Sequence, residues 1–267
     1  MILIVIIILL IVFYFLYSNR EPFRTDIYGY HTPPNKFTKP FNILMANWHN
    51  LTKMINIDYS ISYGTYLGWY RDKKYIPYDY DLDVHIGVEA VDVILGLKKH
   101  RWCFYPSELK YQPIIIGKTY LLINPFHNKP MNFRKRYDCR GKRVYKYMDS
   151  CSFDGIIARL IYYDGKKISH IDIFVFHQEN NPSLRKQNLK KKKAFSYKGP
   201  YAGYITSDLG SSLPKTISTK INGVTTRCFN RIDGKKFLQN IYGKDFLIPD
   251  KIYLNNKWIA KKKIHNL

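Results

Sequence analysis

Three aspartates at alternate positions dominate the stretch Tyr63–Gly87: Asp79, Asp81 and Asp83. On an extended strand, alternate side chains emerge on one face, so these carboxylates would lie side by side. The residues that would form the opposite, apolar face are Tyr80, Leu82, Val84 and Ile86. Neighbouring carboxylates repel one another and raise each other's pKa unless a cation lies among them. The pattern therefore predicts a strand that packs on a core by one face and binds a divalent metal ion with the other.

A candidate phosphate-binding segment precedes the aspartates. Residues 57–63 alternate like a strand and lead to Gly64-Thr65, which predicts a tight turn whose backbone N–H groups could face a phosphate. A short helix through Arg71 would follow, and Pro77 would mark the entry to the aspartate strand. Gly-Thr alone is a weak motif, but its place just before the aspartates predicts a compact cradle for an anion and a metal ion.

A fourth aspartate, Asp172, lies in a second apolar segment. Residues 156–163, the turn Asp164-Gly165 and residues 168–176 predict a β-hairpin. Asp172 has apolar neighbours on both sides, and a buried carboxylate needs a partner. A salt bridge to a lysine or arginine would satisfy it. A metal ion shared with the upstream aspartates is the alternative that their presence favours.

The remaining segments predict helices and strands around these two. A helix is expected from Pro40, with apolar residues at helical spacing through Ile55, and another over residues 88–99. Further expected elements are short strands at residues 114–116 and 120–123, a hairpin at residues 217–229, and a last helix over residues 237–242 that ends at Gly243. The sequence contains no internal repeat and no sign of a second catalytic domain.

Length and cysteine content set broad bounds. At 267 residues, with 46% hydrophobic residues, the chain can form one large globular domain or two small ones. The four cysteines, Cys103, Cys139, Cys151 and Cys228, lack the close pairs of a zinc site. Disulfides in an oxidising compartment and buried free thiols are equal alternatives.

The chain is strongly basic, with 43 Lys and Arg against 20 Asp and Glu and a formal net charge of +23. Such a charge favours anionic partners such as nucleotides, phosphorylated glycans, nucleic acid or an acidic membrane surface, although a coding bias toward Lys, Asn, Ile and Tyr explains it equally well. Two basic segments, residues 134–146 and 185–193, suggest solvated loops, with phosphate contact as the alternative. The second has no interleaved aromatic residues, so nucleic acid is not an expected partner.

Residues 1–17 are all apolar or aromatic. As a helix they would extend about 25 Å at about 1.5 Å per residue, close to the thickness of a bilayer core. No basic leading region or small-residue cleavage site precedes Ser18, which argues against a cleaved signal peptide. We therefore expect a transmembrane anchor at residues 1–18, a proline-containing stem at residues 19–39 and a catalytic domain at residues 40–267.

The aspartate spacing limits the chemistry. Two aspartates at i and i+2, with a third from a neighbouring strand, can hold one or two Mg²⁺ or Mn²⁺ ions. Such ions neutralise a diphosphate and a leaving phosphate, and one carboxylate could accept a proton from an attacking hydroxyl. Asp-x-Asp alone occurs by chance in many proteins. The spacing therefore predicts only a metal-dependent enzyme that acts on a nucleotide-linked donor.

A longer pattern is more specific. Residues 64–71, GTYLGWYR, and residues 76–83, IPYDYDLD, resemble the G-T-x-L-G-x-x-R…I-P-W-D-x-D-h-D motif of the LicD family, which includes fukutin and the fukutin-related protein. Residues 171–174, IDIF, and residues 238–246, LQNIYGKDF, also resemble family segments. The similarity extends over residues 41–250, with Tyr78 in place of the usual tryptophan.

The resemblance implies an α+β fold of the nucleotidyltransferase type, a mixed β-sheet flanked by helices, here preceded by a single N-terminal transmembrane helix. It also implies transfer of a phosphorylated alcohol, such as phosphocholine or ribitol phosphate, from a CDP-linked donor to a glycan or glycoprotein hydroxyl, with Mg²⁺ or Mn²⁺. The residues that carry over are Asp81, Asp83 and Asp172 as metal ligands, with Asp172 alternatively the base, Asp79 as a further ligand or orienting group, and Gly64, Thr65 and Arg71 as contacts to the donor phosphate.

Fukutin-like members have an anchor and a stem and face the Golgi lumen. The resemblance thus implies a single-pass type II membrane protein with a lumenal or extracytoplasmic catalytic domain, in the Golgi, the ER or an envelope. Arg20 and Arg24 beside the anchor favour the opposite orientation. Two other functions stay open: an Asp-x-Asp glycosyltransferase that uses a nucleotide sugar, and an inactive anchored module that binds glycans through its basic surface.

Overall fold

The computed structural model describes residues 24–25, 31–32, 34–100, 103–104, 115–124, 127, 136–137, 143–144, 156–176, 213–254 and 256–260. The chain divides into two compact units, a larger one, Phe37–Ile248, and a smaller one, Met1–Lys36 with Pro249–Leu267. The described strands of the smaller unit form two antiparallel pairs, β1 (Arg24–Thr25) with β2 (His31–Thr32) and β13 (Lys251–Leu254) with β14 (Lys257–Ala260).

The larger unit combines helices with a mixed β-sheet. Its described helices are α2 (Thr38–Met54), α3 (Tyr63–Asp72), α4 (Val91–Gly96) and α6 (Arg231–Tyr242), with 3₁₀ segments η1 (Val88–Ala90) and η2 (Leu97–Lys99) on either side of α4. Its described strands are β3 (Tyr59–Ile61), β4 (Leu82–Gly87), β5 (Cys103–Phe104), β6 (Thr119–Ile123), β7 (Arg136–Tyr137), β8 (Arg143–Val144), β9 (Ala158–Tyr163), β10 (Ile168–Phe176), β11 (Thr216–Ile221) and β12 (Val224–Phe229).

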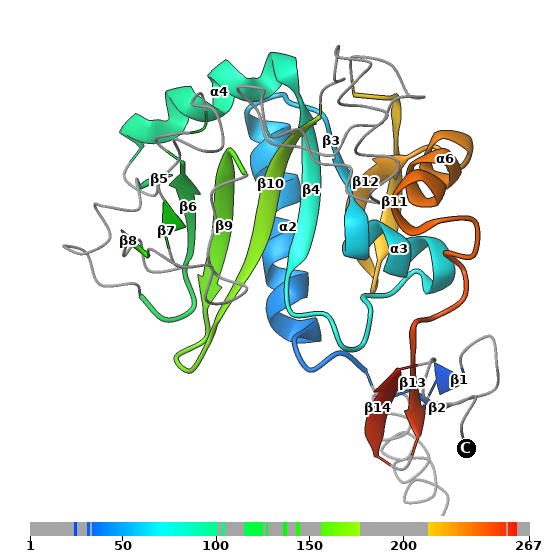
Figure 1. Ribbon diagram of the computed structural model, residues 1–267. Helices are drawn as coiled ribbons and strands as arrows, with labels where there is room; N and C mark the ends of the chain where they lie inside the picture. Colours follow the sequence, from blue (N-terminus) through cyan, green and yellow to red (C-terminus); the bar gives the residue numbers. More distant parts are fainter. Residues whose placement is uncertain are drawn as a thin grey trace, which may run out of the picture. The chain divides into compact units, whose positions relative to one another are not determined.

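Six of these strands form one sheet in the order β3-β4-β10-β9-β6-β5 (Figure 1). The central strands β4 and β10 are parallel, with Leu82 beside Ile171 and Asp83 beside Asp172. Strand β9 pairs antiparallel with both β10 and β6, and β3 pairs antiparallel with β4. The parallel pair therefore brings together the two aspartate-bearing segments, which are far apart in the sequence.

Helix α2 covers one face of this sheet (Figure 1). The helical spacing predicts its buried stripe, which consists of Phe41, Leu44, Met45, Trp48 and Leu51. Alternate strand residues join the stripe in one hydrophobic core: Leu82, Val84 and Ile86 from β4, Ala158 and Leu160 from β9, and Ile171, Ile173 and Val175 from β10. Burial of these side chains stabilises the sheet from this face by removing apolar area from water.

The opposite face of the sheet carries charged side chains at its centre. The register pairs Asp172 of β10 with Asp83 of β4 on one side and with Arg159 of β9 on the other. Residues paired across strands project to the same face, so these three side chains form a row. Two positions further along the same face, His85 lies beside Phe174. The apolar face thus holds the sheet together, while the opposite face positions the polar groups.

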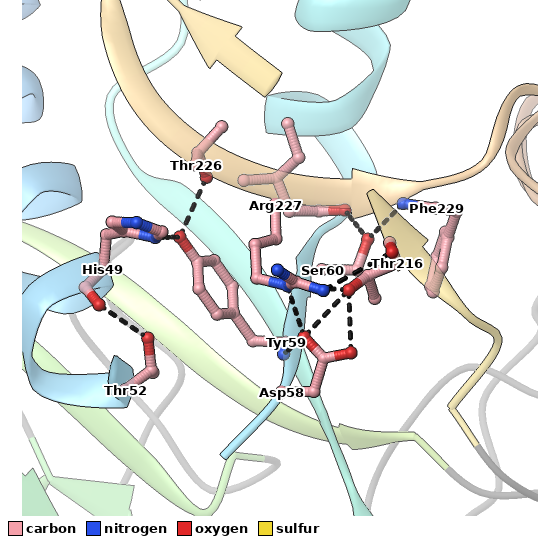
Figure 2. Close-up of polar contacts among 10 residues, drawn as sticks. His49, Thr52, Asp58, Tyr59, Ser60, Thr216, Thr226, Arg227 and Phe229 are labelled. Carbon is pink, nitrogen blue, oxygen red and sulfur yellow. Dashed lines mark hydrogen bonds and ion pairs between the residues drawn. The ribbon is translucent and has the colours of Figure 1, made fainter. Parts of the chain in front are cut away.

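Hydrogen bonds connect the hairpin β11–β12 to β3 and to Asp58, the residue that precedes it (Figure 2). Asp58 accepts hydrogen bonds from the Thr216 hydroxyl at 2.7 and 2.8 Å and from Arg227 Nε at 2.5 Å. The buried Tyr59 hydroxyl lies 3.1 Å from that of Thr226. These bonds hold the strand that leads directly into α3, and so they help to fix where that helix begins.

Several predicted elements are present with shifted bounds. The helix expected from Pro40 is α2, and the two expected hairpins are β9–β10 and β11–β12. The last helix, α6, begins earlier than predicted because the Asn230 side chain accepts hydrogen bonds from the backbone N–H groups of Ile232 and Asp233. The helix predicted over residues 88–99 is interrupted, with 3₁₀ turns at both ends of α4.

Three local predictions are wrong. Gly64-Thr65 lies inside the first turn of α3 rather than in a tight turn. Strand β4 begins at Leu82, so Asp79 and Asp81 precede the strand and only Asp83 lies on it. Tyr80 is consequently 54% exposed instead of facing the core. Ile115 and Ile116 are also exposed and lie outside any strand, because the turn before β6 includes them.

The two cysteines that the structure describes, Cys103 and Cys228, are buried free thiols. Burial raises the pKa of each thiol to about 12, so neither is ionised at neutral pH. Cys139 and Cys151 lie outside the described residues, as do the basic segment 185–193 and most of the segment 134–146.

The predicted fold class needs a correction in its membrane part. Within the described ranges no helix is both long and apolar enough to cross a bilayer. The longest of them, α2, has 17 residues and a polar face in addition to its buried stripe. The fold is therefore a mixed α+β arrangement without a described transmembrane helix. Residues 1–18, for which the anchor was predicted from hydropathy, lie outside the described residues.

Gly68 of α3 packs so closely against the backbone of the following segment that a larger side chain would clash with it. A Cβ atom there would lie 2.5 Å from the carbonyl oxygen of Lys74, whereas a Cβ atom on Gly96 of α4 would meet nothing within 4 Å. We expect Gly68→Ala to destabilise the protein by about 1–3 kcal/mol and Gly96→Ala to stabilise it by about 0.5 kcal/mol. Urea denaturation of the two variants measures both changes, and equal effects would contradict this packing.

Candidate active site

The candidate site is assembled by the register of β4 and β10. Because Leu82 pairs with Ile171, the preceding residues Asp81 and His170 are also neighbours, with 3.9 Å between Asp81 Oδ2 and His170 Nε2. Two residues later along both strands, Asp83 lies beside Asp172. Side chains two apart on a strand share a face, so all four groups gather on the polar face of the sheet.

Three of these side chains could hold a metal ion: Asp81, His170 and Asp172. Each offers one ligand atom, and these atoms lie within 4.8 Å of one another. Carboxylate oxygens and imidazole nitrogens are common ligands of divalent ions such as Mn²⁺ and Zn²⁺. The donor chemistry of the cluster therefore fits a divalent cation, and the prediction that Asp81 and Asp172 come together is consistent with this geometry.

Asp172 also has a cationic protein partner. Arg159 Nε donates to Asp172 Oδ1 at 2.5 Å, and Arg159 Nη2 donates to Asp172 Oδ2 at 2.8 Å. Both side chains are buried, with 1% and 12% of their surface exposed. The sequence left open whether arginine or a metal ion would satisfy Asp172, and the structure shows the arginine. The two are compatible, because an ionised carboxylate has about four acceptor positions and the pair occupies two.

The pKa values of two carboxyl groups on this face, Asp81 and Asp83, are raised. Burial, together with the negative charges of Asp79 and Asp172, raises the pKa of Asp81 to about 8, while Arg159 acts in the opposite direction. Burial and the charges of Asp81, Asp172 and Asp79 likewise raise the pKa of Asp83 well above its usual range. An ion placed among these groups would favour their charged forms, so the electrostatics of the cluster suit a cation.

His170 is held in its neutral form. Burial and the positive charge of Arg159 lower its pKa to about 3, although Asp172 opposes this change. Only a neutral imidazole can bind a metal ion through nitrogen. His170 is therefore in the protonation state that metal coordination requires across the physiological range.

Asp79 lies beside the cluster and against the start of α3. A Cβ atom on Gly64 would lie 2.5 Å from Asp79 Oδ2, so the glycine leaves room for this carboxylate. Asp79 contributes to the raised pKa of Asp81 and Asp83 but is not one of the three residues whose ligand atoms converge. Its position fits an orienting role, and its predicted role as a ligand stays a prediction.

Thr65 and Arg71 make structural contacts in this conformation. The Thr65 hydroxyl accepts a hydrogen bond from the Asp83 backbone N–H at 2.8 Å and is buried. Arg71 Nε donates to the Phe246 carbonyl at 3.0 Å, and its Nη2 donates to the same oxygen and to the Ile248 carbonyl at 3.2 Å. Thr65 thus positions an aspartate, and Arg71 joins the end of α3 to the segment that follows α6. Their predicted contacts with a donor phosphate stay predictions.

Sequence reasoning missed His170 and Arg159. His170 precedes Asp172 by two positions, and alternation along the strand could have placed it on the same face. Arg159 was the only basic residue in the segment 156–163, within the predicted hairpin partner of the Asp172 strand. Its charge in an apolar segment was the available signal, since a buried arginine needs an anionic partner.

Comparisons with known proteins bear on this site. Residues 56–114 match the model of the family described as LicD/FKTN/FKRP, nucleotidyltransferase domain, which confirms the resemblance over the first aspartate segment and indicates a transferase. Among solved structures, the chain is similar to an antigenic nucleotidyltransferase-like protein from Paracoccidioides brasiliensis, with 12% identity, a TM-score of 0.31, and coverage of 79% of this chain and 77% of that chain. A search of curated proteins gave no match.

The burial of the Arg159–Asp172 pair predicts a large stability cost when the arginine is removed. Arg159→Met would leave Asp172 as an uncompensated buried charge, at a cost of about 3–5 kcal/mol. The matched control is Arg227→Met, because Arg227 pairs with Asp58 at the surface, with 34% and 43% of the side chains exposed. We expect that control to cost about 1 kcal/mol or less.

Urea denaturation at neutral pH with a chelator present measures both costs without compensation by metal ions. Equal costs for the two variants would contradict the assignment of Arg159 as the internal counter-charge of the cluster.

Proposed function

We propose that this chain transfers a phosphorylated alcohol, of the phosphocholine or ribitol-phosphate type, from a CDP-linked donor to a hydroxyl of a glycan or glycoprotein. The observation that carries the proposal is the convergence of Asp81, His170 and Asp172 on one face of the sheet, next to a segment that matches a nucleotidyltransferase family. A carboxylate-rich site of this kind suits Mg²⁺ or Mn²⁺ together with a diphosphate.

The residues have separable roles in this proposal. Asp81 and Asp172 would hold the ion, which would supply positive charge to the donor diphosphate and the leaving phosphate. Gly64 and Thr65 lie in the first turn of helix α3, where backbone N–H groups carry partial positive charge and suit an anion. Arg71 has five N–H donors, and a contact from its guanidinium to the donor remains part of the proposal.

Asp83 is suited to receive the proton from the acceptor. It lies beside Asp172 but outside the three converging ligands, and an ion in the site would favour the ionised form of Asp83, which can accept a proton. The acceptor oxygen forms a bond to the donor phosphorus that carries the alcohol, the bond from that phosphorus to the bridging oxygen breaks, and CMP leaves. Asp172 is the alternative base, although both of its carboxylate oxygens already accept hydrogen bonds from Arg159.

A glycosyltransferase that uses a nucleotide sugar is the second candidate, because Asp-x-Asp also binds metal ions in such enzymes. The family match favours phosphoryl transfer over glycosyl transfer. Mass spectrometry of the product separates the two, since phosphoryl transfer leaves a phosphodiester and glycosyl transfer leaves a plain glycosidic bond. An inactive glycan-binding module is less consistent with the structure, because buried like charges without a function destabilise the fold.

Removal of the carboxylates should abolish turnover while the fold persists. We expect Asp81→Asn and Asp83→Asn each to reduce metal-dependent turnover of a CDP-linked donor at least about 100-fold. The isosteric control is Asp92→Asn, because Asp92 is exposed on α4, away from the cluster. Release of CMP measures turnover, and circular dichroism verifies folding. Full activity of the double variant would remove the proposal.

Metal binding should strengthen as the pH rises. In the absence of an ion Asp81, whose pKa is about 8, holds a proton at neutral pH. Coordination needs the carboxylate, so binding releases this proton and the affinity rises by up to about tenfold per pH unit below pH 8. Calorimetry with Mn²⁺ from pH 6 to 8.5, in two buffers of different ionisation enthalpy, measures the affinity and the proton release. A constant affinity over this range would contradict the raised pKa.

A further inference from the structure

We propose that His170 is the nitrogen ligand of the metal site and that it makes the site prefer Mn²⁺ to Mg²⁺. The inference rests on the proposed metal-dependent function and goes beyond it, because the aspartate motif implies oxygen ligands alone.

The geometry places the imidazole among the carboxylates rather than in contact with them. His170 Nε2 lies 3.9 Å from Asp81 Oδ2 and 4.0 Å from Asp172 Oδ1, both beyond hydrogen-bonding distance. Two ligand atoms that each lie about 2.1 Å from one ion are roughly 3–4 Å apart. These separations are therefore those expected of atoms that share an ion.

Packing within the sheet holds the His170 ring in this position. His170 lies in the middle of the sheet, on β10, between Asp81 on one side and Ile161 of β9 on the other. Its side chain is 2% exposed, so its orientation is set by packing and not by solvent. Asp172, two residues along the same strand, is held by Arg159. Two of the three donor atoms, those of His170 and Asp172, thus belong to one buried strand, which fixes their positions relative to each other.

The presence of a nitrogen ligand affects which divalent ion the site prefers. Mg²⁺ prefers oxygen ligands and binds imidazole weakly, whereas imidazole suits the later divalent metals, and affinity for nitrogen-containing sites rises from Mn²⁺ toward Zn²⁺. A mixed site with a nitrogen ligand therefore favours Mn²⁺ over Mg²⁺.

The neighbouring strand offers a matched control, His85. His85 is buried on the same face of β4, but its Nε2 lies 3.0 Å from the Tyr63 hydroxyl and it is outside the three converging ligands. His85→Asn thus removes a buried imidazole from the same sheet without removing a proposed ligand. His170→Asn removes the proposed nitrogen ligand, and His170→Asp replaces it with an oxygen ligand.

Pulsed electron paramagnetic resonance of Mn²⁺ bound to the full-length protein tests the inference directly, because a coordinated imidazole modulates the echo through its ¹⁴N nucleus. We expect this modulation in the unaltered protein, its replacement by a ¹⁵N signal after labelling with ¹⁵N-histidine, its retention in His85→Asn and its loss in His170→Asn. Calorimetry should show the ratio of Mn²⁺ to Mg²⁺ affinity falling about tenfold or more in His170→Asn and falling also in His170→Asp.

The outcomes separate this inference from the proposed function. If the unaltered protein binds Mn²⁺ with no ¹⁴N modulation, His170 is not a ligand, while a carboxylate metal site and the proposed function stand. If His85→Asn abolishes the modulation and His170→Asn retains it, the wrong histidine has been assigned. If the protein binds no divalent ion at all, the metal-dependent function fails together with the inference. The measurement of ¹⁴N modulation in the unaltered protein needs no variant, so it tests the inference even if His170→Asn does not fold.

Discussion

The parallel pairing of β4 with β10 is the constraint on which the candidate site depends. Since side chains alternate along a strand, the register that puts Asp172 beside Asp83 also puts His170 beside Asp81. A slip of one residue would turn these polar groups toward the core and expose the apolar face. The burial of apolar side chains against α2 therefore opposes such a slip, and the register sets the positions of the charged groups. The free energy that holds the site residues in place therefore comes from the apolar core and not from the site residues themselves.

Arg159 makes this concentration of negative charge compatible with a folded chain. The buried guanidinium of Arg159 binds Asp172, while burial and the negative charges of the neighbouring carboxylates raise the pKa of Asp81 and of Asp83. Part of the repulsion is thus relieved by the arginine and part by protonation. A bound cation would replace these protons in relieving the repulsion. Ion binding is thereby linked to proton release and to stability.

The sequence predicted the components of the site better than their geometry. Local periodicity predicted the strands that became β4 and β10, although of the three alternating aspartates only Asp83 lies on β4. Alternation along the strand places His170 on the face of Asp172, but only the register between β4 and β10, which no local pattern contains, brings it beside Asp81. Thr65 and Arg71 show a different limit. A motif match does not distinguish a residue that touches a ligand from one that holds the fold, and in the structure both hold it.

Helix α3 explains why one motif contains both kinds of residue. Its first turn lies against Asp79 and bonds the backbone of Asp83, while Arg71 near its end bonds the Phe246 carbonyl. The helix is therefore a rigid connection between the aspartate segment and the C-terminal segment of the larger unit. A metal site needs its ligands held to within about half an ångström, and packed strands and helices provide this where a loop cannot. Asp79 and Asp81 precede the strand, so the contact of Gly64 with Asp79 and the start of β4 at Leu82 must together restrain the one part of the site that lies outside regular structure.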